Sequence, residues 1–184
     1  MLRSRHLAQQ RGNDMKASKK KSADPNTPRP RTAARMAAVQ ALYQMDLAGT
    51  DVSEVIEEFV SVRFRDTVAG EDEETGDGFE SADAVFFADI LKGVVRRQRD
   101  IDPLVDQQLA TGWRLVRVDS ILRAILRAGV FELMERPDVP ARVIINEYIN
   151  VAHAFFSEDE PRVVNGVLDR IAHKLRTAEL NPGQ

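Results

Sequence analysis

The sequence contains no cysteine among its 184 residues. Thiolate zinc sites, iron–sulfur clusters and cysteine nucleophiles are therefore excluded, and a chain without disulfides fits a reducing compartment. It also lacks an apolar run long enough to cross a bilayer, and no secretory apolar stretch follows its basic N-terminus. We therefore expect a cytoplasmic protein. Its hydrophobic share of 43% suffices for one compact domain or for two small helical groups that share a core.

Side chains for catalysis are also scarce. The sequence has three histidines (His6, His153 and His173) and no HExxH spacing. His153 stands next to Ala152 in an apolar segment, so we expect it to be packed in the interior rather than catalytic. No glycine-rich phosphate loop occurs, and the carboxylates of the acidic 66–80 segment lie on an expected loop that cannot hold an acid and a base at a fixed separation. We expect no enzyme, no cofactor and no metal site.

The charge is divided unevenly along the chain. Residues 1–35 hold 10 Lys/Arg and 2 Asp, which gives 10 − 2 = +8, and residues 36–184 hold 16 Lys/Arg and 27 Asp/Glu, which gives 16 − 27 = −11. An acidic body with a basic arm suggests that the arm binds a polyanion, RNA or DNA. The alternative is a solvated tail that only keeps the protein soluble.

Hydrophobic periodicity predicts an all-α fold of about seven helices, because no window alternates with period two between turn signals. Residues 1–28 show no apolar periodicity and are predicted to be a disordered basic tail, within which Met15 is an alternative start. From Thr32 the pattern becomes helical and continues to Gly49. Its apolar face consists of Met36, Val39, Leu42 and Tyr43, and Arg35 is expected to be an exposed basic residue one turn before this face.

Capping residues predict where the later helices begin. Helices are expected to start at Asp51, at Ser81 after the acidic loop, at the Asp102–Pro103 pair, at about Asp119, and at Glu160–Pro161. The segment ARVIINEYINVAHAFF is apolar almost all round, so we expect it to be the central and most buried helix. Within the last helix, Asn165–Gly166 interrupts no periodicity; a close helix–helix approach at the glycine is favoured over a ligand contact.

Four segments together resemble the NusB family of bacterial transcription antitermination factors. They are RTAARMAAVQALYQMD, VDSILRAILRAGVFELMERPDVP, VPARVIINEYINVAHAF and RVVNGVLDRIAHKLR, which occur in this order between about Arg31 and Arg176. The helix-embedded VNGVLD after INE is the most specific part of the match. The resemblance implies two three-helix sub-bundles within a domain spanning residues 29–178, and a factor without catalytic activity.

The resemblance also implies partners and a site. Members of the family bind the boxA element of ribosomal RNA leader transcripts together with NusE, a small-subunit ribosomal protein, and support transcription by RNA polymerase. Carried onto this chain, the RNA-binding residues are Arg29, Arg31, Thr32, Arg35, Arg162 and Asn165, and the NusE-facing residue is Asp119. Relatives often have an aromatic residue where this chain has Val163.

Two other functions remain open at this point. NusB-like domains also occur as RNA-binding parts of RNA cytosine methyltransferases, in which case the chain would serve rRNA modification; its end at Gln184 without a methyltransferase domain favours the free-standing factor. The other alternative is a helical scaffold that binds only proteins, with an incidental basic arm.

Overall fold

The structure, a computed structural model, describes residues 29–64, 79 and 82–181. Within these ranges every regular element is helical, which confirms the all-α prediction. The short π-helix η1 (Phe59–Arg63) follows the second helix, and the 3₁₀ turn η2 (Leu115–Arg117) precedes the fourth. The seven α-helices are α1 (Pro30–Ala48), α2 (Val52–Glu58), α3 (Ala84–Asp106), α4 (Ser120–Glu135), α5 (Ala141–Phe155), α6 (Glu160–Leu175) and α7 (Thr177–Leu180).

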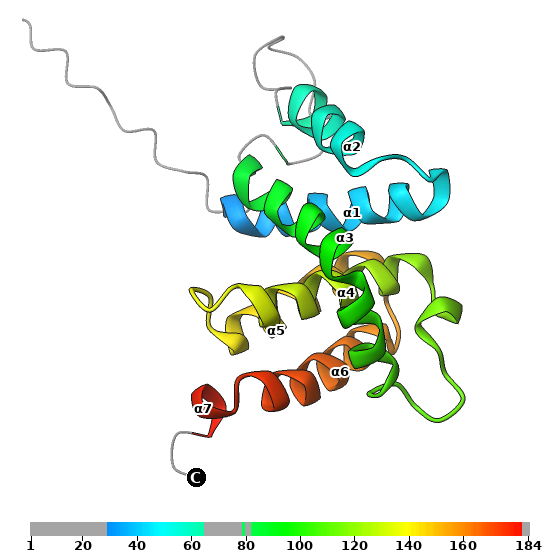
Figure 1. Ribbon diagram of the computed structural model, residues 1–184, viewed down its shortest axis with the longest axis vertical. Helices are drawn as coiled ribbons and strands as arrows, with labels where there is room; N and C mark the ends of the chain where they lie inside the picture. The colour runs from blue at the N-terminus through cyan, green and yellow to red at the C-terminus, as the bar shows by residue number, and fades with distance from the viewer. Residues whose placement is uncertain (1–28, 65–78, 80–81, 182–184) are drawn as a thin grey trace, which may run out of the picture.

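The helices form two groups that pack on each other through α4. Figure 1 shows α1 and α2 in the upper half of the molecule and α5, α6 and α7 in the lower half, with α4 between them and α3 running from the upper group down past α4. Helix α4 packs against α1, α3, α5 and α6. None of the helices within the described ranges is both long and apolar enough to cross a bilayer.

The central helix is α4, which corrects the expectation that the segment forming α5 is the most buried. Eleven of the sixteen residues of α4 are buried, against six of the fifteen in α5. Although α5 contains apolar residues on nearly every side, only one of its faces has a partner, and Val143 remains 43% exposed. Position between two helical groups, rather than composition, therefore determines which helix is most buried.

Most of the predicted helix ends are confirmed. Helix α1 ends at Gly49, whose φ of 66° lies in the left-handed region that glycine adopts without strain. The Asp51 carboxylate caps α2 by accepting from the backbone N of Ser53 at 2.7 Å, and Asp119 caps α4. Ser81 lies outside the described residues, and the side chain that caps α3 is that of Asp83, which accepts from the backbone N of Phe86 at 2.9 Å.

The Asp102–Pro103 pair does not begin a new helix, because α3 runs through it to Asp106. A proline inside a helix removes one hydrogen bond and usually kinks or ends the helix. Here Ile101 and Val105, on either side of the proline, are both fully buried, so core packing holds the helix across the missing bond. Tertiary contacts thus override the local start signal.

Gly166 does not mark a close helix approach, contrary to the prediction. A Cβ built there would lie 3.6 Å from the nearest atom, Nη1 of Arg170, which is an ordinary contact. Close approaches occur instead at Gly93 in α3, where a Cβ would overlap the ring of Phe131 of α4, and at Gly129 in α4, where a Cβ would lie 2.8 Å from Leu168 of α6. His153 is also exposed rather than packed, so that expectation was wrong. The predicted tail, residues 1–28, lies outside the described residues, as does most of the predicted acidic loop.

Candidate nucleic-acid interface

The basic start of α1 is attached to two other parts of the molecule. Arg29 and Arg31 are exposed and Thr32 is half-buried. Nη1 of Arg31 lies 3.5 Å from Oδ2 of Asp138, in the turn between α4 and α5, and its Nε lies 4.0 Å from Oδ2 of Asp83. The backbone N of Asp83 also donates to the carbonyl of Pro30 at 3.0 Å. The first turn of α1 is therefore held in one place.

Arg35 lies in the interior and not on this surface, which corrects the expectation that it is an exposed basic residue. Its side chain is only 3% exposed. Its Nε and Nη2 donate to the two carboxylate oxygens of Glu132 in α4, at 2.8 and 2.7 Å, and its Nη1 donates to Glu147 in α5 at 3.4 Å. Tyr148 donates its hydroxyl to the same Glu132 at 2.7 Å. Arg35 joins α1 to α4 and α5, because the first turns of α1 pack against both helices.

The surroundings of this buried group keep Arg35 charged. Burial by itself would lower the pKa of Arg35, but the hydrogen bond and charge of Glu132, together with Tyr148 and Glu147, raise that pKa above its ordinary value. Burial, reinforced by the charge of Glu132, raises the pKa of Tyr148 well above its ordinary value. Arg35 therefore keeps its charge and Tyr148 its proton. Because the donors of Arg35 are directed at carboxylates inside the protein, it supports the start of α1 and presents no charge to solvent.

A half-exposed stripe runs along α1 from its basic start to its end. Thr32, Met36, Gln40 and Tyr43 are partly exposed, and Leu47 is 64% exposed. Their spacing of three or four residues places them on one face of the helix. A helix of 19 residues is about 28 Å long, so the stripe connects two distant parts of the surface.

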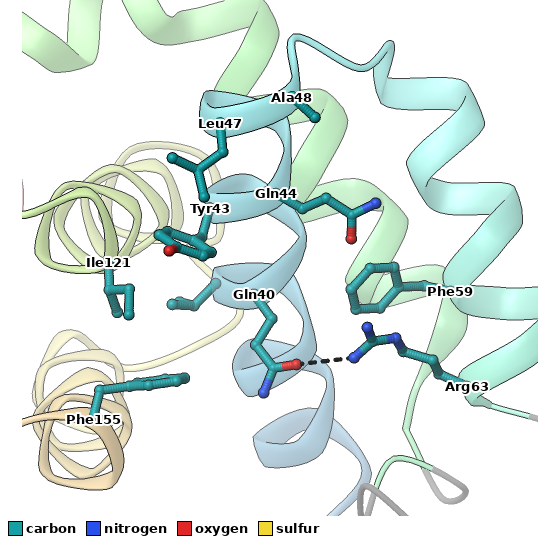
Figure 2. Close-up of a pocket in the computed structure, with 10 residues that line it drawn as sticks. Gln40, Tyr43, Gln44, Leu47, Ala48, Phe59, Arg63, Ile121 and Phe155 are labelled. Atoms are coloured by element: carbon teal, nitrogen blue, oxygen red, sulfur yellow. Dashed lines mark hydrogen bonds between the residues drawn. The ribbon is translucent and has the colours of Figure 1, made fainter.

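The far end of the stripe lies in an open groove of about 530 Å³ between α1, η1 and the end of α5. In Figure 2 the side chains of Tyr43 and Leu47 face those of Ile121 and Phe155 on one side of α1, and Gln40 faces Arg63 on the other. Gln40 accepts from Nη1 of Arg63 at 3.2 Å. The ten lining residues are Val39, Gln40, Tyr43, Gln44, Leu47, Ala48, Phe59, Arg63, Ile121 and Phe155.

The sequence did not predict this groove, because Tyr43 falls on the face of the helix that was expected to be buried. Tyr43 is only half-buried, whereas Val39 and Leu42 on the same predicted face are buried. The available signal was that Tyr43 stands beside the polar Gln44, at the edge of the apolar stripe. Phe155 belongs to another helix, and no local pattern could have paired it with Tyr43.

The predicted second half of the RNA surface lies at the start of α6. Arg162 is 87% exposed and its Nη1 lies 3.2 Å from Oδ1 of Asp159, and Asn165 is exposed. The end of α6 lies near the end of α4, since Nε of Arg176 donates to the carbonyl of Leu133 at 2.7 Å. The basic start of α1 lies near that same end of α4.

The structure therefore does not bring Arg162 and Asn165 next to Arg29 and Arg31. Because α6 ends near the start of α1, its own start lies at the opposite end of the molecule (Figure 1). That start follows Phe155 of the groove by five residues. The groove thus lies between the two predicted halves of the surface, with the stripe of α1 as the connection.

Asp119, the predicted NusE-facing residue, is exposed at the start of α4. Its Oδ1 accepts from the backbone N of Ile121 at 2.8 Å and of Leu122 at 3.3 Å. These bonds satisfy backbone donors that the helix leaves unpaired, so the carboxylate has a structural role at this position.

Comparison with known proteins identifies relatives of this chain. The NusB family model matches residues 32–173. The chain is 52% identical over 153 residues to the transcription antitermination protein NusB of Rhodopseudomonas palustris strain TIE-1, covering 83% of this chain and 84% of that one. A solved structure of T. maritima NusB superposes with a TM-score of 0.63 at 29% identity, covering 79% of this chain and 92% of that one.

A further solved structure contains the antitermination factors NusB and NusE in complex with double-stranded RNA. It matches with a TM-score of 0.57, covering 78% of this chain and 96% of that one. At 23% identity this likeness establishes a shared fold.

Proposed function

The chain belongs to the NusB family of transcription antitermination proteins, and we propose that it binds the boxA element of ribosomal RNA leader transcripts together with NusE. It is a transcription antitermination factor and not an enzyme. In the proposed role it acts in the cytoplasm, in the complex that keeps RNA polymerase from terminating. Residues 29–178 are the proposed binding unit, with the basic residues of 1–28 as an electrostatic supplement.

The observation that supports this proposal is the half-exposed stripe along α1, which joins the basic start of the helix to the groove. Arginines at its start suit phosphate, because a guanidinium forks to phosphate oxygens, and Arg31 is 48% exposed. The groove at its other end offers the rings of Tyr43 and Phe155, and single-stranded RNA is recognised by stacking its splayed bases on aromatic side chains. One strand laid along α1 would meet both, and would then reach Arg162 and Asn165 at the start of α6.

The groove also accounts for the absence of an aromatic residue at position 163. Val163 is partly buried against the core and offers no ring. Tyr43 and Phe155, which both line the groove, supply the flat apolar surface that a base needs. The stacking function is therefore assigned to the groove rather than to the first turn of α6.

A requirement for NusE follows from the weakness of the basic surface. Arg35 is internal and Arg31 already has acidic neighbours, so few unopposed cations remain near the start of α1. A second protein that contacts both NusB and RNA raises the effective concentration of the RNA at this surface. Asp119, exposed at the start of α4, is the residue proposed to face NusE.

Variants along α1 test the path. Tyr43→Leu removes the ring and keeps an apolar side chain, and should weaken boxA binding about 5- to 150-fold, the range of one base–aromatic stack. The matched variant Tyr43→Phe keeps the ring and should bind as the wild type does. Arg31→Gln should weaken binding and reduce the slope of log K against log salt by about 0.7, the increment for one phosphate on a single strand.

The proposal fails if wild-type protein, with NusE present, binds boxA and scrambled RNA equally. It also fails if Tyr43→Leu and Tyr43→Phe bind alike while both keep the thermal midpoint of the wild type. Either result would favour a scaffold that binds proteins only.

A further inference from the structure

Three guanidiniums surround one buried ring near the start of α1. The ring is that of Phe86, which is 2% exposed, and the Cζ atoms of Arg31, Arg35 and Arg136 each lie 4.9 Å from its centroid. Arginine stacks on aromatic faces through its planar guanidinium. Phe86 therefore positions two partly exposed arginines, Arg31 and Arg136, next to each other, although they are 105 residues apart in the sequence.

Carboxylates already occupy these two arginines. Nε and Nη2 of Arg136 donate to the two oxygens of Asp138 at 2.8 and 2.9 Å, and its Nη1 donates to Asp89 at 2.7 Å. Arg31 shares Oδ2 of the same Asp138 at 3.5 Å and lies 4.0 Å from Asp83. Within this cluster two cations face three anions, 2 − 3 = −1, so carboxylates offset the positive charge that Arg31 brings to the start of α1.

Asp138 is the carboxylate common to both arginines. The hydrogen bond from Arg136 holds the pKa of Asp138 well below its ordinary value, and the hydrogen bond to Asp138 raises the pKa of Arg136. Both groups are therefore ionised at neutral pH. Asp138 is 49% exposed and lies in the turn between α4 and α5. An anion from solvent can therefore approach the two arginines from the side that Asp138 occupies.

We propose that Arg31 and Arg136 form a phosphate-binding pair in which Asp138 is the resident anion that an RNA phosphate displaces. This inference rests on the proposed function and adds to it one RNA-binding residue, Arg136, and one competitor, Asp138. A phosphate presents oxygens to a guanidinium in the same forked geometry as a carboxylate, so it can take the place of Asp138 between the two arginines.

The competitor gives the site selectivity. A phosphate on arbitrary RNA must displace Asp138 and gains only the arginines. A strand that is also held in the groove of Tyr43 presents its phosphate at a high effective concentration, and so displaces Asp138 more readily. The intramolecular anion thus lowers the affinity for every RNA, and it lowers the affinity for unmatched RNA more than the affinity for boxA.

The test measures RNA affinity after the charge of Asp138 is removed. Asp138→Asn keeps the shape of the side chain and should tighten boxA binding about two- to fivefold, the range that one half-exposed ion pair is worth. Scrambled RNA should gain more than boxA does, so the preference for boxA should shrink. The slope of log K against log salt should become steeper by up to about 0.7.

Two controls separate competition from a general effect of charge. Asp100→Asn makes the same charge change at a similarly exposed carboxylate, which is paired with Arg97, and it lies 14 residues, about 21 Å of helix rise, beyond Phe86 in α3. It should change RNA affinity by less than twofold. In Arg31→Gln protein the gain from Asp138→Asn should become smaller, because one of the two arginines that it releases is absent.

Unchanged or weaker boxA binding by Asp138→Asn overturns the inference, as does an equal gain from Asp100→Asn. Should Asp138→Asn fail to fold, Arg136→Gln decides, because the proposed pair needs both arginines; weaker boxA binding by this variant supports the inference and unchanged binding overturns it. Wild-type protein that binds no RNA would refute the proposed function instead, so the two failures are distinguishable.

Discussion

Replacing Arg35 by alanine should destabilise the protein strongly. Among the described residues, the substitution leaves the carboxylate of Glu132, which is fully buried, with the hydroxyl of Tyr148 as its one hydrogen-bond donor, and it removes the guanidinium that lies 3.4 Å from Glu147. Breaking a buried ion pair by removing one partner costs about 3–5 kcal/mol, because the other charge stays buried and unpaired. For a domain of this size the loss corresponds to a fall in Tm of roughly 6–20 °C.

Arg31→Ala is the matched control, since it removes the same residue type one turn earlier on the same helix. Arg31 is 48% exposed, and surface substitutions usually change stability by less than about 0.5 kcal/mol. Urea and thermal denaturation of both variants, followed by circular dichroism, measure the difference. If Arg35→Ala and Arg31→Ala unfold at the same denaturant concentration, Arg35 does not link α1 to α4 and α5 through a buried ion pair. Arg35 would then again be a candidate for the exposed RNA-binding surface.

Three further predictions concern packing, pH and the basic tail. Gly129→Ala should lower the free energy of unfolding by about 1–3 kcal/mol, because its Cβ would meet Leu168 at 2.8 Å. Gly166→Ala should raise it by about 0.5–1 kcal/mol, because its helical site has room for a methyl group, and denaturant titration of the two variants checks both. The raised pKa of Tyr148 contributes stability that is present below the unfolded-state pKa of about 10 and is lost as pH rises through the folded-state value. Above pH 10 the free energy of unfolding should therefore fall less in Tyr148→Phe than in the wild-type protein. Removing residues 1–28, which hold seven Lys/Arg, should lower RNA affinity mainly at low salt and leave Tm unchanged, as titrations at two salt concentrations and a melting curve would show.

The helices could be predicted from the sequence where their signals are local. Helix α4 begins and ends where its capping aspartate and apolar periodicity place it, because both signals lie within the segment itself. The break predicted at Pro103 was wrong, because the burial of the residues around it depends on other helices. The close helix approach predicted at Gly166 was wrong for the same reason: a sequence shows that a glycine is helical, but not which helix lies opposite it.

The site could be predicted only in part. The basic start of α1 and the exposed start of α6 follow from the sequence and the family resemblance. The burial of Arg35 does not, since its partner Glu132 is 97 residues away in the chain. The groove is equally non-local, as Tyr43 and Phe155 come from different helical groups. The acidic partners of Arg31 also come from distant segments, so the charge of the linear sequence overstates the charge of the folded surface.

The most direct test of the central claim is the dissociation constant of boxA RNA measured with and without NusE. We expect this protein alone to bind boxA weakly, because the basic surface is small and largely neutralised by Asp83, Asp89 and Asp138. Adding NusE should lower the dissociation constant for boxA and should lower that for scrambled RNA less. A dissociation constant that NusE leaves unchanged would contradict the account.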